Sequence, residues 1–169
     1  MTLLDEMLEG WDYARMSVLA EAEALPDEGY AYRPHPRSRS FAELMLHIVE
    51  SGQLMVGELT RPDGDFTRKP YLELVREHAG DLPEELDPAG IRALLERTLQ
   101  EGKERFREAG EVHMLQLIRR FDGERSSRLA WMCHGIQHEE YHRGQAALYV
   151  RLQGHVPALS RAIYGAEAR

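Results

Sequence analysis

Apolar residues recur at helical spacing along four long segments of the sequence, and this pattern constrains the fold more than any other feature. The segments are residues 2–25, 40–60, 88–109 and 126–152. Each spans several turns of an α-helix. Proline and glycine crowd the connections between them, and strand signals are almost absent. The chain is therefore predicted to be all-α, with four helices packed as a bundle.

The boundaries of these segments carry residues that are typical of helix ends. Ser40 followed by Glu43 resembles a capping box at the start of the second helix. The long connection between the second and third helices has room for a short helix at 71–79. Residues 110–124 fit either a short helix or an extended crossing piece, and the tail after the fourth helix is expected to be irregular.

Length, charge and cysteine content narrow the class of protein. The 169 residues suit one domain, which we expect to span residues 1–169. The formal net charge of −8 argues against nucleic acid as a partner. No stretch approaches the roughly 18 apolar residues of a membrane span, and the N-terminus lacks the basic region of a signal peptide. Cys133 is the only cysteine, so no internal disulfide can form and a cytoplasmic location is expected.

A histidine pair in the fourth segment is the strongest chemical signal. His138 and His142 are four residues apart, so they lie one above the other on a helix and can bind one metal ion. Imidazole is a common protein ligand of divalent transition metals. His47, on the second helix, is the leading candidate for a third ligand, and three ligands leave coordination positions open. The spacing alone leaves metal binding and ordinary packing as equal alternatives.

Three further residues share the predicted face of that pair. His134 fits three roles: an outer hydrogen-bond partner of the site, a substrate contact or a core residue. Tyr141 and Gln145 could orient a bound molecule, although packing is an equally good interpretation for both. The other histidines are interpreted as solvated, and these are His35, His78, His113 and His155.

The same residues match the His-Glu-x-x-His string of zinc proteases, with Glu139 as the general base. Glu139 lies about 100° around the helix from His138, away from the face that the two histidines share. No third ligand follows at the spacing that such proteases need, and the only carboxylate left downstream is Glu167. Protease activity is therefore disfavoured.

Residues 129–154 closely resemble the last bundle helix of the DinB/YfiT-like superfamily, which commonly shows His-x-x-x-His-x-x-x-His-Arg-Gly-Gln. The run from His134 to Gln145 matches that pattern position by position. Residues 40–47 resemble the family segment that ends in its first metal-binding histidine. The resemblance implies a four-helix bundle with a long crossover connection, usually a homodimer. It also implies a site for Zn²⁺, Ni²⁺, Fe²⁺ or Mn²⁺ formed by His47, His138 and His142.

The resemblance implies three alternative functions. Relatives include S-transferases and isomerases that use low-molecular-weight thiols such as bacillithiol or mycothiol. The expected function is therefore metal-dependent S-transfer, in which a thiol activated as thiolate attacks a small-molecule electrophile. The first alternative is a metal-dependent hydrolase that uses a metal-bound water. The second is a non-catalytic, stress-linked metal-binding protein.

Overall fold

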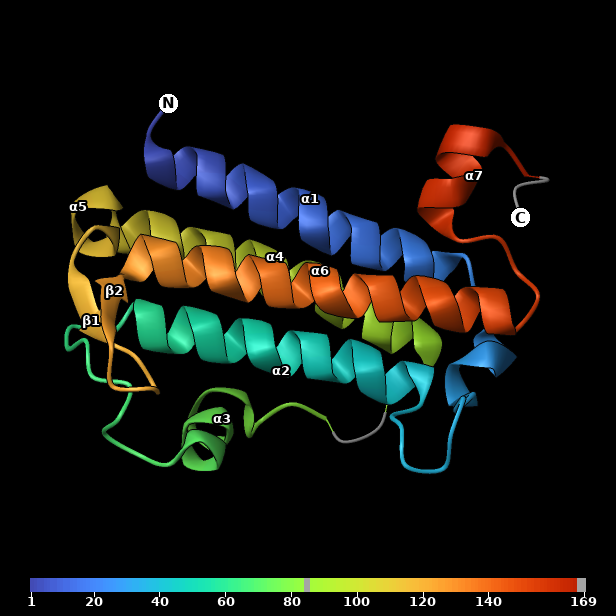
Figure 1. Ribbon diagram of the computed structural model, residues 1–169, viewed down its shortest axis with the longest axis horizontal. Coiled ribbons are helices and arrows are strands. Elements are labelled where there is room, and N and C mark those ends of the chain that lie inside the picture. Colours follow the sequence, from blue (N-terminus) through green and yellow to red (C-terminus); the bar gives the residue numbers. More distant parts are fainter. Residues whose placement is uncertain (84–85, 167–169) are drawn as a thin grey trace.

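The computed structural model describes residues 1–83 and 86–166, and four long helices dominate it (Figure 1). These helices lie side by side along the long axis of the molecule. They are α1 (Leu3–Glu23), α2 (Phe41–Leu59), α4 (Pro88–Ala109) and α6 (Arg128–Leu152). Their bounds agree with the four segments of helical periodicity to within a few residues. The prediction of an all-α four-helix bundle is thus confirmed.

The order of the helices within the bundle explains the length of the second connection. Helices α1 and α6 run in one direction, and α2 and α4 run in the other (Figure 1). Helix α2 packs on both α4 and α6, and α1 packs on the same two helices. Because α2 and α4 are parallel, the chain must return along the whole bundle between them. The predicted short helix, α3 (Tyr71–Ala79), lies on this crossover and packs against α2.

Local side-chain caps fix where the long helices begin. The Ser40 hydroxyl accepts a hydrogen bond from the Glu43 backbone N–H, and the Glu43 carboxylate accepts one from the Ser40 backbone N–H. Thr2 and Asp5 form the same reciprocal pair at the start of α1. A cap of this kind typically stabilises a protein by about 1 kcal/mol. The cap at Ser40 also sets the register of α2, and with it the positions of all side chains further along that helix.

The connections contain regular structure that the sequence pattern only partly indicates. Residues 110–124 combine both predicted alternatives, because α5 (Glu111–Met114) is followed by the strand β1 (Leu117–Arg119). Strand β1 pairs antiparallel with β2 (Arg125–Ser127), and Leu117 lies opposite Ser127. A short 3₁₀ helix, η1 (Asp27–Ala31), occupies part of the first connection.

The expectation of an irregular tail is wrong, because α7 (Ala158–Tyr164) follows α6 and packs on α1. Pro157 precedes the helix, and the Ala158 backbone N–H donates to the Glu21 carboxylate on α1 at 3.0 Å. This helix therefore depends on a contact with a distant residue, which a local sequence pattern does not reveal. No helix among the described residues is both long and apolar enough to cross a membrane.

A layer of buried polar groups divides the hydrophobic core into two halves. One half surrounds Phe41 and Val18, and the other surrounds Phe106 and Trp11. Between them, the guanidinium of Arg15 pairs with the carboxylate of Glu139, and both side chains are almost fully buried. The Arg15 guanidinium also donates to the Thr98 hydroxyl at 3.1 Å and to the Leu95 carbonyl at 2.9 Å. These partners satisfy charges that would otherwise be very costly to bury.

Candidate metal centre

The three histidines predicted as ligands lie together between α2 and α6. His47 is on the second turn of α2, and His138 and His142 are one turn apart on α6. Helices α2 and α6 pack against each other, which brings the two sets of side chains face to face. The ring of His47 is 5.4 Å from that of His138 and 4.8 Å from that of His142, measured between ring centres. We call these three residues the histidine triad.

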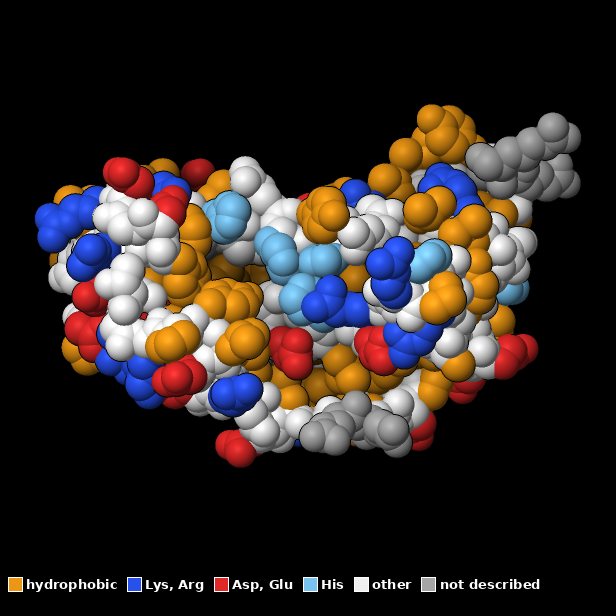
Figure 2. Space-filling model, turned by 60° about the horizontal axis from the view of Figure 1, so that its bottom comes forward, with side chains coloured by type: hydrophobic (Ala, Val, Ile, Leu, Met, Phe, Trp, Pro, Cys, Tyr) orange, Lys and Arg blue, Asp and Glu red, His pale blue; other side chains and the backbone are white. Residues whose placement is uncertain are grey.

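The nitrogens of the histidine triad converge on a common point. One ring nitrogen from each residue can be chosen so that all three lie within 4.8 Å of one another. The Nε2 atoms of His138 and His142 face each other at 3.1 Å. Such spacing suits nitrogens that bind one ion at about 2.0–2.1 Å each. Figure 2 shows histidine side chains gathered in the middle of one face of the molecule, beside a hollow with hydrophobic walls.

A hydrogen bond orients the ring of His142, and a carboxylate lies near the ring of His47. The Gln145 side-chain oxygen lies 2.8 Å from Nδ1 of His142, so that Nδ1 donates a hydrogen bond and Nε2 is left as the free nitrogen. A Glu50 carboxylate oxygen lies 3.6 Å from Nδ1 of His47. Metal-binding histidines commonly carry such partners on the nitrogen that points away from the ion. The structure thus places Gln145 beside a triad ring.

The environment keeps the triad neutral at physiological pH. Burial, followed by the positive charge of Arg39 and by the other two rings, lowers the pKa of His47 to about 4. Burial and the neighbouring His142 also lower the pKa of His138 to about 4. The pKa of His142 is lowered by burial as well, against the opposing effect of its hydrogen bond to Gln145. Neutral imidazole is the form that binds metals, so the donor set fits Zn²⁺, Ni²⁺, Fe²⁺ or Mn²⁺.

The other two predicted site residues lie at the edge of the triad. Tyr141 is exposed, with its ring centre 5.0 Å from that of His142. His134 is also exposed, and its ring stacks on Trp131 with a centre-to-centre distance of 4.5 Å. His134 therefore belongs to the wall of a neighbouring pocket, which it shares with His138. Of its three predicted roles, the structure excludes that of a core residue.

Glu139 is engaged elsewhere and does not face the triad. Its carboxylate pairs with Arg15 and accepts a hydrogen bond of 2.6 Å from the indole N–H of Trp11, and only 4% of the side chain is exposed. The alternative of a zinc protease with Glu139 as general base therefore finds no support in the geometry. Glu167, the remaining carboxylate considered for that mechanism, lies outside the described residues.

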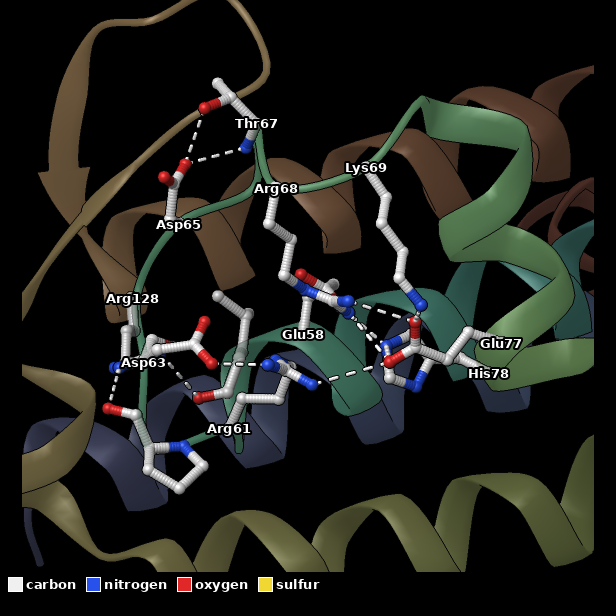
Figure 3. Close-up of polar contacts among 12 residues, drawn as sticks. Glu58, Arg61, Asp63, Asp65, Thr67, Arg68, Lys69, Glu77, His78 and Arg128 are labelled. Carbon is white, nitrogen blue, oxygen red and sulfur yellow. Dashed lines mark hydrogen bonds and ion pairs between the residues drawn. The ribbon is translucent and has the colours of Figure 1, made fainter.

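A second group of potential ligands lies at the other end of α2 (Figure 3), and sequence reasoning missed it. Glu58, Glu77 and His78 also place three ligand atoms within 4.8 Å of one another. We call them the Glu58 cluster. Nε2 of His78 is 2.6 Å from a carboxylate oxygen of Glu58, which is 1% exposed. The prediction that His78 is solvated is wrong, because its ring lies over Gly57, where even a methyl group would overlap it.

Cations already occupy the carboxylates of the Glu58 cluster. Arg68 forms ion pairs with both Glu58 and Glu77, and Lys69 lies 2.6 Å from Glu77. Hydrogen bonds from Arg68 and Lys69 lower the pKa of Glu77 to about 2. Burial alone would raise the pKa of Glu58, but the hydrogen bonds from His78 and Arg68 outweigh it and lower that pKa. The cluster is an ion-pair network that fastens the crossover to α2.

The remaining histidines divide into two kinds. His35 and His155 are exposed, as predicted. His113 is not fully solvated, because its Nε2 lies 2.9 Å from the Leu59 carbonyl at the end of α2. Neither His78 nor His113 carried a local signal of burial, because both stand in short elements whose partners are distant in the sequence.

Comparison with known proteins identifies the family. A family model described as the DinB superfamily matches residues 11–146. A DinB-like protein of Bacillus subtilis, YjoA, superposes with a TM-score of 0.69 at 21% identity, covering 89% of this chain and 93% of that chain. No protein of curated function matches the sequence.

Two further solved structures share the fold. YfiT of Bacillus subtilis, described as a probable metal-dependent hydrolase with an unusual four-helix bundle topology, superposes with a TM-score of 0.68 at 13% identity. That match covers 89% of this chain and 87% of YfiT. A mycothiol-dependent maleylpyruvate isomerase superposes with a TM-score of 0.62 at 12% identity, over 85% of this chain and 62% of the isomerase. At such identities these structures show a shared fold alone.

Proposed function

The chain belongs to the DinB superfamily, and from this premise and the geometry of the histidine triad we propose that it is a metal-dependent S-transferase. In this proposal His47, His138 and His142 bind one divalent ion, and a low-molecular-weight thiol such as bacillithiol reacts there with a small-molecule electrophile. The observation that carries the proposal is the convergence of three neutral imidazoles beside an apolar pocket that shares His138.

In this proposal some residues of the site bind the metal ion, and others orient the residues that bind it. The triad supplies three nitrogen ligands, and Gln145 holds the ring of His142 in the orientation that leaves Nε2 free. A site with three protein ligands leaves coordination positions for a small molecule. A divalent ion in such a site supplies Lewis acidity, which lowers the pKa of a coordinated thiol or water.

The acid–base groups around the triad favour a thiol over water. Among the described residues, the one carboxylate within 4 Å of a triad nitrogen is that of Glu50, which lies 3.6 Å from Nδ1 of His47. Glu139, the acidic residue of the motif, is committed to Arg15 in the core. A thiol with a pKa of about 8.5 needs much less assistance to lose its proton than water with a pKa of about 15.7. The positive charge of Arg39, felt by all three rings, also favours an anionic ligand.

Metal-dependent hydrolysis is the second candidate, because YfiT, described as a probable metal-dependent hydrolase, shares the fold. It would use the same three histidines, with water in place of the thiol. A non-catalytic metal-binding role is the third candidate and uses the same residues again.

Two measurements test the proposal in order. Metal analysis of the purified protein, with His47→Ala and His142→Ala alongside, is expected to find one bound ion in the wild type and little in either variant. Conjugation of a generic electrophile is then measured with bacillithiol, mycothiol, glutathione and cysteine. Metal-dependent consumption of one thiol supports the S-transferase. Metal-dependent cleavage of esters or amides without thiol consumption favours the hydrolase, and inactivity in both assays favours the binding role.

A further inference from the structure

A pocket of about 230 Å³ opens beside the histidine triad. His138 belongs to both, so a molecule in the pocket reaches the triad directly. The pocket lies between α2 and α6 and is flanked by residues of the crossover and of the turn between β1 and β2. Its volume exceeds that of the roughly 150 Å³ apolar cavity that accepts benzene in an engineered protein. A single ring with a short polar substituent therefore fits.

Aromatic side chains form the outer wall of this pocket. The ring centre of Phe121 lies 5.1 Å from that of Phe66, 5.3 Å from that of Tyr71 and 6.1 Å from that of Trp131. The pairs that Phe121 makes are tilted or edge-on, and Trp131 is itself stacked on His134. The ring of Trp131 already contacts the stacked His134 and the Arg120 guanidinium, which lies over it at 4.9 Å from the ring centre. A further flat group would therefore contact the edge of Trp131 and the rings of Phe121 and Tyr71, at the centre distances of about 4.5–7 Å that are typical of aromatic pairs.

The floor of the pocket adds a sulfur atom. Helices α2 and α6 approach so closely there that a methyl group at Gly135 would overlap the thioether of Met55. Both residues line the pocket. Thioether sulfur makes favourable contacts with aromatic rings of about 0.3–1.5 kcal/mol. The floor and the wall thus favour the same kind of ligand.

The lining is electrically neutral. None of the described residues that line the pocket is an aspartate, glutamate, lysine or arginine, and its polar side chains are those of Ser51, Tyr71, Trp131 and the two histidines. A charged group placed inside would lose its hydration without gaining a partner. The pocket therefore excludes the charged part of a ligand and accepts its uncharged part.

The outer wall is held in place before any ligand arrives. Phe66 and Tyr71 stand on either side of Arg68, whose ion pairs with Glu58 and Glu77 fasten this stretch to α2 and α3. The Phe66 backbone N–H also donates to the Arg119 carbonyl of β1 at 2.9 Å. A wall fixed in this way spares a ligand the entropy cost of ordering it.

We propose that this pocket binds the uncharged aromatic ring, or a similarly flat conjugated group, of the protein's substrate. The proposal rests on the proposed function and deepens it, because the polar end of the same molecule would lie at His138. The recognition element is the aromatic wall of Phe66, Tyr71, Phe121 and Trp131.

The test compares a flat ligand with a puckered one of the same skeleton. Binding of 2-phenylacetamide and 2-cyclohexylacetamide is measured by NMR titration of protein freed of metal with EDTA. The wild type is expected to bind the phenyl compound about 2–10-fold more tightly, as aromatic contacts of about 0.5–1.5 kcal/mol imply. In Trp131→Leu and Phe121→Leu that preference should fall toward onefold, whereas Tyr13→Leu, which changes an exposed tyrosine on α1, should keep it.

Equal affinity for the two amides in the wild type would overturn the proposal. So would an unchanged preference in both wall variants while circular dichroism shows native helix content. Phe121 is 36% exposed in a turn, so Phe121→Leu decides the question if Trp131→Leu fails to fold. The titration contains no metal, so a failure of the triad to bind an ion leaves this result standing, and a failure here leaves metal binding and thiol chemistry untouched.

Discussion

The histidine triad and the Glu58 cluster are the two places where the described residues bring three potential metal ligands within 4.8 Å of one another. The triad consists of neutral rings, and the one charged group within 4 Å of its nitrogens among the described residues is the Glu50 carboxylate. The Glu58 cluster consists of two carboxylates and one histidine, and Arg68 and Lys69 already bind its carboxylates. Geometry is similar in the two clusters, but the charges are not.

The difference teaches that converging ligand atoms do not by themselves define a metal site. A cation that enters the Glu58 cluster must displace a guanidinium from two carboxylates, one of which is buried. A cation that enters the triad displaces only protons or water, and the low pKa of His47 and His138 means that few protons compete at pH 7. The histidine triad can thus accept a metal ion, whereas the carboxylates of the Glu58 cluster are already paired with Arg68 and Lys69.

The largest expected effect is on Zn²⁺ affinity, which should depend on the histidine triad and not on the Glu58 cluster. His142→Ala removes one of three ligands and should weaken Zn²⁺ binding about 10³-fold, since the binding free energy of a structural site is about 10–16 kcal/mol shared among its ligands. His78→Ala should leave the affinity unchanged, because the Glu58 cluster does not bind the ion. Competition with a chromophoric chelator measures both. Equal losses in the two variants would contradict the distinction.

The next effect tests whether Arg68 takes the place of a metal. Arg68→Met leaves the carboxylate of Glu58 buried without its cation, and should lower the free energy of unfolding by about 3 kcal/mol. Arg97→Met, which removes a pair with Glu101 between two exposed side chains, should cost less than about 0.5 kcal/mol. Urea denaturation measures both variants.

Arg68→Met also tests whether Arg68 is what prevents the Glu58 cluster from binding a metal ion. Without Arg68, Glu58 loses its guanidinium partner, and Glu77 keeps only its pairs with Lys69 and Arg61. Mn²⁺ or Zn²⁺ should therefore restore part of the stability lost in Arg68→Met. The background His142→Ala removes the contribution of the triad. Stability that is unaffected by metal in this double variant would show that the Glu58 cluster is unsuited to cations for a reason other than its charge.

The two clusters should lose stability in different pH ranges. In metal-free protein, His47 and His138 have a pKa of about 4 when folded and about 6.5 when unfolded. Between these values the unfolded chain binds more protons, so stability falls as the pH decreases from about 6.5 to about 4, by on the order of 2 kcal/mol for each half-buried ring. The effect of Glu77, with a folded pKa of about 2, belongs to the range from about 4.5 to about 2.

Urea denaturation of EDTA-treated protein across pH 7 to pH 4 measures this effect. The double variant His47→Gln, His138→Gln should lose most of the dependence between pH 6.5 and pH 4. Saturating Zn²⁺ should shift the onset of the wild-type loss to lower pH, because bound metal keeps the rings unprotonated. A wild type that is equally stable at pH 6.5 and pH 4 would show that the rings are not held neutral by burial.

The smallest effects come from the outer partners of the triad. Gln145→Leu removes the hydrogen bond to Nδ1 of His142 and should weaken metal binding about 10-fold. Glu50→Gln should change it less than about twofold, because that carboxylate is 45% exposed and 3.6 Å from its ring. The chelator competition used for His142→Ala resolves both. A larger loss in Glu50→Gln would reverse the order of importance of the two contacts.

The sequence predicted the bundle well because its helices are specified locally. Periodic apolar residues and caps such as Ser40 with Glu43 act within a few residues of themselves. The histidine pair on α6 was visible for the same reason, since four-residue spacing places two side chains together on any helix. His47, on the second helix, was the leading candidate for their companion, and the resemblance to the family pointed to the same residue.

The rest was not predictable because it depends on contacts between distant segments. Phe66 and Phe121 stand in connections with no periodic pattern, and only the fold brings them into one wall. The burial of Glu58 and its pairing with Arg68 likewise need the crossover to turn back on α2. Helix α7 depends on Glu21, which precedes it by well over a hundred residues. Tertiary partners of this kind leave no trace in a window of local sequence.

The buried pair of Arg15 and Glu139 has a consequence for anyone who re-engineers this protein. Glu139 directly follows His138, so the anchored carboxylate fixes the rotation of α6 about its own axis, and with it the direction in which His138 and His142 point. Well-packed apolar replacements for such pairs are often neutral or stabilising. A redesigned core could therefore be more stable and yet hold His138 and His142 in less well-defined orientations. The geometry of the metal centre depends on a buried ion pair that no substrate contacts.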